Sequence, residues 1–138
     1  MTIRIQAEDF DAGAEIARIS AVSTNVGGVC SFLGLVRDSG ENSAITAMTL
    51  EHYPGMTEKQ LAKIEAEARE RWPLDDSLII HRYGRFEPGG QIVLVVTASA
   101  HRKAAFEACE FLIDWLKTKA PFWKSEETLD GTTWVEAK

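Results

Sequence analysis

Long apolar runs are missing from this chain of 138 residues. The longest, residues 92–98, is interrupted by Thr97 and is far too short to span a membrane. The first residues, MTIRIQAEDFDAG, lack the basic-then-apolar order of a secretory signal. We therefore expect a cytoplasmic protein that makes no membrane contact, and a length of this kind suits one domain over residues 1–138.

Positive charge and cysteine are also scarce. The formal net charge is −6, which argues against a general nucleic-acid coat because contacts to phosphates need a basic face. The two cysteines, Cys30 and Cys109, are far apart and form no CxxC pair. Both lie in apolar surroundings, where a free thiol usually packs as a small hydrophobic group. A disulfide between them fits poorly with a cytoplasmic protein.

Familiar catalytic motifs are absent too. No serine lies in a GxSxG elbow, and the sequence has neither a Walker loop nor GxGxxG. Glu51 and His52 are adjacent, but on a strand their side chains point to opposite faces, and His81 stands alone in the sequence. No His, Cys and Asp spacing fits zinc, so we expect neither a metal nor a cofactor. What remains is the chemistry of cationic side chains on an anionic substrate.

The hydrophobic pattern predicts an α+β fold with three helices against a mostly antiparallel sheet. Strands are expected at residues 2–6, 28–37, 44–53, 77–86 and 91–100. The short loop between the second and third of these indicates an antiparallel hairpin. Helices are expected at 11–22, 57–72 and 101–118. Thr57 and Gln60 form a capping-box signature, Pro73 ends the second helix, and Asp130-Gly131 indicates a terminal hairpin.

The helix expected at residues 101–118 is apolar around most of its circumference, with Phe106 widening the apolar face. One narrow polar stripe remains, made of Lys103, Glu107, Glu110, Asp114 and Lys117. Lys117 stands at the C-terminal end of that stripe. Lys124 follows the turn at Pro121 and could fold back towards it. Ammonium groups held close together repel unless an anion joins them, so the pair predicts a pocket for a negatively charged ligand.

Each of these basic residues also has an ordinary structural interpretation. Lys117 could pair with Asp114 on the helix surface while Lys124 is solvated. His101-Arg102, at the strand-to-helix junction, could form an anion site with the free backbone N–H groups, or simply cap the helix and face solvent. Arg37, at the end of an apolar strand, either completes the basic cluster or keeps the strand edge from pairing.

Six segments of the sequence are distinctive: in order they are GLVRD, LEHYPGMTEKQL, RWPL, HRYGRFEPGG, SAHRKAAFEA and WLKTKAPFWK. Together they resemble one family, the large, catalytic subunit of molybdopterin synthase. They span most of the chain, from about Gly28 to Trp134. LEHYPGMTE and KTKAPFWKSE are long and unusual, so the series is a specific signal.

The resemblance implies a sulfurtransferase of molybdenum cofactor biosynthesis, with an α/β hammerhead fold and a small added α+β part. It would convert a cyclic pyranopterin monophosphate, precursor Z, into molybdopterin by placing two sulfurs on adjacent carbons as a dithiolene. The sulfur would arrive as a thiocarboxylate on the C-terminal Gly-Gly tail of a small ubiquitin-like subunit. Two large subunits would form a homodimer, each binding a small subunit, which gives a heterotetramer. The family needs no metal for this step.

By motif position, Lys117 and Lys124 match the essential lysines of the family. Arg37, His101 and Arg102 match its substrate-pocket residues, with Leu35, Val36, Ser125 and Glu126 beside them. The hypothesis that follows is that His101 and Arg102 hold the phosphate with help from Arg37. Lys117 would stabilise the thiocarboxylate and the charge that develops on transfer, and Lys124 would orient the pterin and move protons.

The sequence departs from the family at two points. It ends at Lys138, where members often continue with a charged tail, and Ser125 stands where a second basic residue is frequent, so a lower affinity for the substrate phosphate is expected. Two rival functions remain open. One is a scaffold that grips the tail of a ubiquitin-like carrier without chemistry, and the other is a different acyl- or sulfur-transfer enzyme. The intact KTKAPFWK segment favours the synthase.

Overall fold

Two four-stranded sheets form the framework of the computed structural model, which describes residues 1–39 and 44–135. The first sheet has the order β1 (Thr2–Gln6), β4 (Leu74–Arg82), β6 (Gln91–Ser99) and β2 (Gly28–Leu35). The second has the order β5 (Gly84–Phe86), β3 (Ala47–His52), β7 (Phe122–Thr128) and β8 (Gly131–Val135). Strands β1 and β4 run parallel, and the other paired strands run antiparallel. Together with three helices, this arrangement confirms the predicted α+β class.

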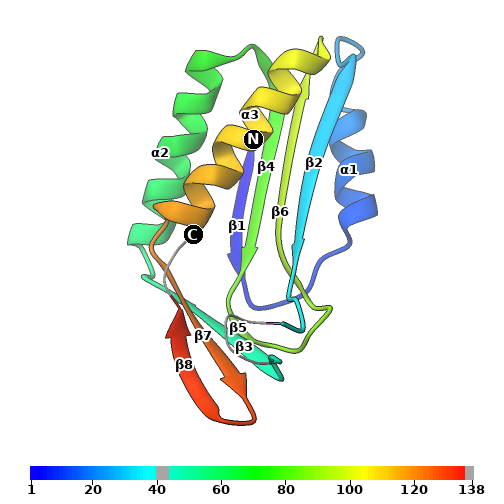
Figure 1. Ribbon diagram of the computed structural model, residues 1–138. Coiled ribbons are helices and arrows are strands. Elements are labelled where there is room, and N and C mark those ends of the chain that lie inside the picture. Colours follow the sequence, from blue (N-terminus) through cyan, green and yellow to red (C-terminus); the bar gives the residue numbers. More distant parts are fainter. Residues whose placement is uncertain (40–43, 136–138) are drawn as a thin grey trace.

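Helices cover both faces of the first sheet (Figure 1). Helix α1 (Ala12–Ser20) lies on one face, and α2 (Met56–Arg71) and α3 (Arg102–Thr118) lie on the other. The pleat of β4 explains why both faces are apolar, since Leu78 and Ile80 join the α1 core while Ile79 joins the core under α2 and α3. All three are fully buried, and burying such a side chain contributes about 1.5–3 kcal/mol.

Helix α2 lies between Gly55, which precedes its first residue, and Pro73, which follows shortly after its last. At its N-terminus the N–H of Gly55, which has a φ of 86°, donates to Glu58 Oε2 at 2.7 Å. The predicted capping role of Thr57 was wrong, because Thr57 is buried and its hydroxyl donates to the Tyr53 carbonyl at 2.8 Å. The predicted stop at Pro73 is confirmed, since the helix ends at Arg71.

The hairpin expected between residues 28–37 and 44–53 was wrong. Strand β2 pairs with β6 in the first sheet, whereas β3 lies between β5 and β7 in the second. Among the described residues beside the loop, Ser39 and Ala44 form an isolated antiparallel bridge. The two strands belong to different sheets because each finds a long partner elsewhere, and local proximity in sequence does not outweigh those longer ladders.

The strand expected at residues 77–86 is divided by a change of sheet. Strand β4 ends at Arg82, Gly84 has a φ of 116°, and β5 continues in the second sheet. A left-handed backbone at this point suits glycine, which carries no Cβ. The chain thereby passes from one sheet to the other just after His81. The terminal hairpin is confirmed as β7–β8, where Gly131 has a φ of 124°.

Helix α3 buries most of the apolar surface that its sequence predicted. Ala105, Ala108, Cys109, Leu112 and Leu116 are buried, but Phe106 is 62% exposed and does not widen the apolar face as expected. Both cysteines are free thiols, with Cys109 buried as predicted and Cys30 half-buried. Within residues 1–39 and 44–135, no helix is both long and apolar enough to cross a membrane.

Candidate functional site

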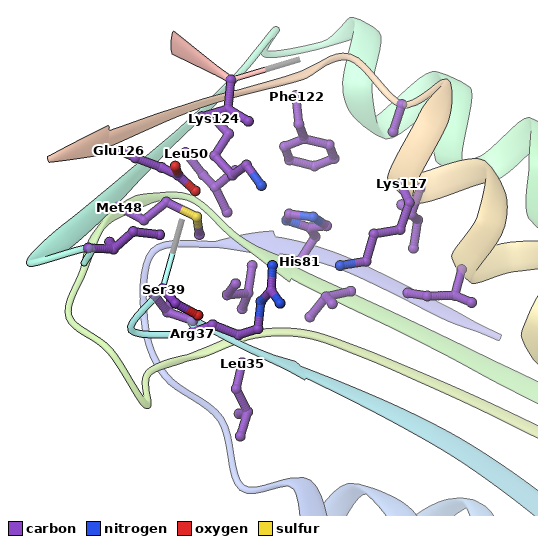
Figure 2. A pocket seen from close by; sticks show the side chains of 18 residues that line it. Leu35, Arg37, Ser39, Met48, Leu50, His81, Lys117, Phe122, Lys124 and Glu126 are labelled. Carbon is purple, nitrogen blue, oxygen red and sulfur yellow. The ribbon is translucent and has the colours of Figure 1, made fainter. Parts of the chain in front are cut away.

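A pocket of about 300 Å³ opens where the two sheets meet at the C-terminal end of α3. Its walls come from β3, β4, β6, β7, the end of α3 and the segment that follows β2 (Figure 2). Much of the lining is apolar, contributed by Leu35, Val36, Ile45, Met48, Leu50, Ile92, Val93, Ile113, Leu116, Ala120, Phe122 and Val135. Charged groups in such walls interact more strongly than they would in water.

Three cations reach this pocket from separate elements. Lys117 comes from the last turn of α3, Lys124 from β7, and Arg37 from just beyond β2. Figure 2 shows their charged ends directed towards a common space. The turn after α3 is tight, because the N–H groups of Lys119 and Ala120 both donate to the Trp115 carbonyl, at 2.8 and 3.1 Å. Strand β7 then starts at once, and this brings Lys124 back to Lys117 as the sequence suggested.

The pocket disfavours the charged form of Lys117. Partial burial lowers the pKa of Lys117, and the positive charges of Lys124 and Arg37 lower it further. Among the ion pairs of the described residues, none involves Lys117 or Lys124, so the alternative of a Lys117–Asp114 pair is not observed. Glu126 supplies a carboxylate to the same lining. An anionic ligand would relieve the repulsion among the three cations.

Strand β7 explains why some of its residues reach the pocket and others do not. Phe122, Lys124 and Glu126 line it at alternate positions. Ser125 points to the other side and is 5% exposed. Of the residues predicted from the family motif, Leu35 and Val36 also line the pocket, whereas Ser125 does not.

His101 and Arg102 lie at the opposite end of α3. Lys117 is fifteen positions beyond Arg102 in the helix, which corresponds to roughly 22 Å. His101 is the N-cap residue, but its side chain makes no capping hydrogen bond. Arg102 instead lines a hollow of about 40 Å³ beside Cys30 and Phe106. Within one chain the pair therefore does not lie beside the lysines, because the helix between them is continuous (Figure 1).

His81 is the pocket residue that sequence analysis missed. It is 7% exposed, lines the pocket, and stacks on Phe122 with ring centroids 3.7 Å apart. Its Nδ1 lies 2.9 Å from the Arg82 carbonyl oxygen. Burial, with a smaller contribution from the charges of Lys117 and His52, lowers the pKa of His81 to about 4. The available signal was strand alternation, since residues 77, 79 and 81 share the face of β4 that looks towards α2 and α3.

The part of the chain that the structure describes contains no group of three or more His, Cys, Asp and Glu side chains placed to hold a metal ion. The polar lining is instead cationic, with one carboxylate and one imidazole. Such a set can bind anions, stabilise developing negative charge and transfer protons.

Comparison with known proteins identifies the family of this chain. The family model described as MoaE protein matches residues 5–119. The molybdopterin synthase catalytic subunit of Ralstonia nicotianae is 56% identical over 137 residues, covering 99% of this chain and 78% of that protein. A solved structure of molybdopterin synthase from Staphylococcus aureus is 32% identical with a TM-score of 0.87, covering 96% of this chain and 95% of that chain.

A further solved structure extends the likeness in fold. It is a complex of subunits 1 and 2 of molybdopterin-converting factor from Helicobacter pylori, 23% identical with a TM-score of 0.78. That match covers 99% of this chain and 91% of the other and supports the fold alone. The family model and the Ralstonia relative, which both cover most of the sequence, carry the assignment. The chain therefore belongs to the MoaE family, that of the molybdopterin synthase catalytic subunits.

Proposed function

We propose that the pocket at the end of α3 carries out the sulfur transfer of a molybdopterin synthase in the cytoplasm. The substrate is the cyclic pyranopterin monophosphate, and the sulfur donor is the thiocarboxylate at the Gly-Gly tail of a small ubiquitin-like subunit. The observation that carries the proposal is the convergence of Arg37, Lys117 and Lys124 in one largely apolar pocket of a family member. Substrate and donor are both anions, and converging cations make their meeting favourable.

Each cation has a role that its position suggests. Lys117 stands where the charges of Lys124 and Arg37 already oppose its own, so its ammonium gains most from a thiocarboxylate and from the negative charge that develops on transfer. Lys124 orients the pterin and moves protons as the precursor ring opens. Arg37 offers a planar fork to the phosphate. The polar edge formed by Glu126 completes the substrate-binding wall.

His101 and Arg102 fit this function only from another copy of the chain. Their end of α3 is too far from Lys117 to meet the same substrate molecule. In a homodimer of large subunits, the pair of one copy would contact the phosphate held in the pocket of its partner. Each large subunit would also bind one small subunit, so the assembly would be a heterotetramer.

One reconstitution tests the function. Purified protein, thiocarboxylated small subunit and precursor Z are combined, and dithiolene is followed through its fluorescent oxidised derivative. Product with the wild-type protein and none with Lys117→Ala is the expected result. A stable complex with the small subunit and no product from the wild-type protein would instead establish the tail-binding scaffold. Turnover with a different acceptor would indicate another sulfur-transfer enzyme.

A further inference from the structure

The imidazole of His81 has a fixed tautomer. A carbonyl oxygen can only accept a hydrogen bond, so the 2.9 Å contact between Nδ1 and the Arg82 carbonyl places the ring proton on Nδ1. Nε2 then carries a lone pair. Stacking on Phe122, with an angle of 17° between the planes, holds the ring in this orientation. His81 is therefore a preset hydrogen-bond acceptor on the floor of the pocket (Figure 2).

Nε2 has no partner within the protein as far as residues 1–39 and 44–135 show. In the same residues the one buried side-chain nitrogen or oxygen without a partner is Arg4 Nε. Nε2 is thus not sealed in the core but is open to the pocket that His81 lines. A lone pair in this position is available to water or to a bound reactant.

Sulfur transfer from a thiocarboxylate creates a need for such an acceptor. The sulfur first bonds to a substrate carbon as a carbon–oxygen bond at that carbon breaks and its oxygen leaves. The sulfur is then joined both to the substrate and to the acyl carbon of the carrier tail. The acyl–sulfur bond must then break, and water is the simplest acyl acceptor. Its oxygen joins the acyl carbon, the carrier leaves as a carboxylic acid that ionises, and the sulfur stays on the substrate as a thiol. One proton has to move from water to sulfur.

We propose that His81 is the general base of this hydrolysis, an inference that rests on the proposed sulfur transfer. Nε2 accepts a proton from the water as its oxygen attacks the acyl carbon. The imidazolium then returns that proton to the departing sulfur, so His81 ends the step neutral. Lys117, in the same pocket, stabilises the oxyanion on the acyl carbon between these two events.

The charges around His81 make its pKa depend on whether the substrate is bound. Lys117 from α3 and Lys124 from β7 share its pocket with Arg37, and Glu126 contributes the opposing carboxylate. His52 from β3 also opposes protonation. Burial, together with the charges of Lys117 and His52, keeps the pKa of His81 far below its ordinary value. A bound phosphate offsets the cations and so raises that pKa, which makes the imidazole a stronger base once substrate is present.

Two substitutions of His81 distinguish the role of Nδ1 from that of Nε2. In His81→Asn the amide keeps a donor near Nδ1 for the Arg82 carbonyl but removes Nε2, whereas in His81→Gln an amide oxygen takes the approximate place of Nε2 without being a base. The acyl-linked adduct of carrier and pterin is followed by intact mass spectrometry, with thiocarboxylated small subunit and precursor Z. The decay of this adduct in H₂O and D₂O gives the hydrolysis rate. Thermal unfolding and binding of the small subunit show whether each variant is intact.

We expect the adduct to form normally and to decay about 10²-fold or more slowly in both variants, with loss of the wild-type solvent isotope effect. If the His81→Asn variant fails to fold, the His81→Gln variant alone decides the outcome. A wild-type decay rate in His81→Gln would overturn the proposal, because orientation without proton transfer would then suffice. Slower formation of the adduct with unchanged decay would overturn it too. Wild-type protein that forms neither adduct nor product would refute the underlying sulfur transfer, a result distinct from these.

Discussion

The two ends of α3 carry similar charges in different surroundings. At the N-terminal end, His101 and Arg102 are exposed, and Arg102 borders a hollow of about 40 Å³. At the C-terminal end, Lys117 shares a pocket of about 300 Å³ with two further cations. The pKa of Lys117 is lowered by this environment. A basic residue becomes chemically distinctive through what converges on it, and residue type alone does not distinguish the two ends.

The difference also indicates a division of labour. The C-terminal end of α3 holds a nearly complete cationic site within one chain, with an imidazole as its floor. At the N-terminal end His101 and Arg102 are exposed, and among the described residues no comparable pocket encloses them. They can therefore enclose a substrate only together with a second protein surface. Substitutions at the two ends should therefore fail in different ways, and this contrast can be tested.

The largest expected effect belongs to the C-terminal end. Lys117→Ala removes the cation that faces the thiocarboxylate and the developing charge, so kcat should fall by about 10²–10³-fold or more. Fluorescence of the oxidised product measures the loss, and thermal unfolding and binding of the small subunit should stay close to wild type. Lys103→Ala, on the exposed surface of the same helix, is the matched control. Retained turnover in the Lys117 variant would refute its role.

A smaller effect is expected at the N-terminal end. Arg102→Ala should raise KM for the pterin phosphate by about 10–100-fold through loss of a charge-assisted hydrogen bond, with a lesser change in kcat. The sharper test mixes this variant with Lys117→Ala after exchange of subunits. Each mixed dimer would then contain one pocket with both residues intact, and activity should return. If mixing restores nothing, Arg102 does not serve a partner's pocket.

Local signals predicted the elements of this fold well and their pairing poorly. The apolar period and Pro73 located α2, and Asp130-Gly131 located the β7–β8 hairpin. These features depend on neighbouring residues. The separation of β2 and β3 into different sheets depends on β6 and β7, which lie far along the chain, and no turn residue encodes it.

The site shows the same limit. The motif around Lys117 and Lys124 indicated a pocket, and helix geometry together with the turn at Pro121 brings the two residues together. His81 was missed because its pocket neighbours come from β2, β3, β6, α3, β7 and β8, and none of them is near it in sequence. The sequence did not show that His101 lies far from Lys117 within one chain, because its position at the start of a helix says nothing of a pocket at the other end.

The buried pocket at the C-terminal end of α3 should make the free energy of unfolding depend on pH. The folded-state pKa of His81 is lowered from 6.5 to about 4. Between these two pH values the unfolded chain therefore binds a proton at His81 that the folded chain does not bind. The free energy of unfolding is therefore highest above pH 6.5 and decreases as the pH falls towards 4, by at most about 3 kcal/mol. Urea unfolding should show this loss in the wild type and a smaller one in His81→Phe, which keeps the stack on Phe122. An equal dependence of the unfolding free energy on pH in both proteins would contradict the assignment.

The smallest effect concerns the cost of holding Lys117 in place. Its lowered pKa means that the ammonium is disfavoured in the folded state at neutral pH, and this penalty fades only as pH rises towards the ordinary lysine range. Lys117→Met keeps the length of the side chain and removes the charge, so it should raise Tm slightly at pH 7 while abolishing turnover. The gain should shrink when inorganic phosphate is added, because an anion bound among the three cations stabilises the wild-type protein by mass action and the variant less. A lower Tm for Lys117→Met without phosphate would mean that the ammonium stabilises the fold, and the pocket would then lack the strain that makes it receptive to anions.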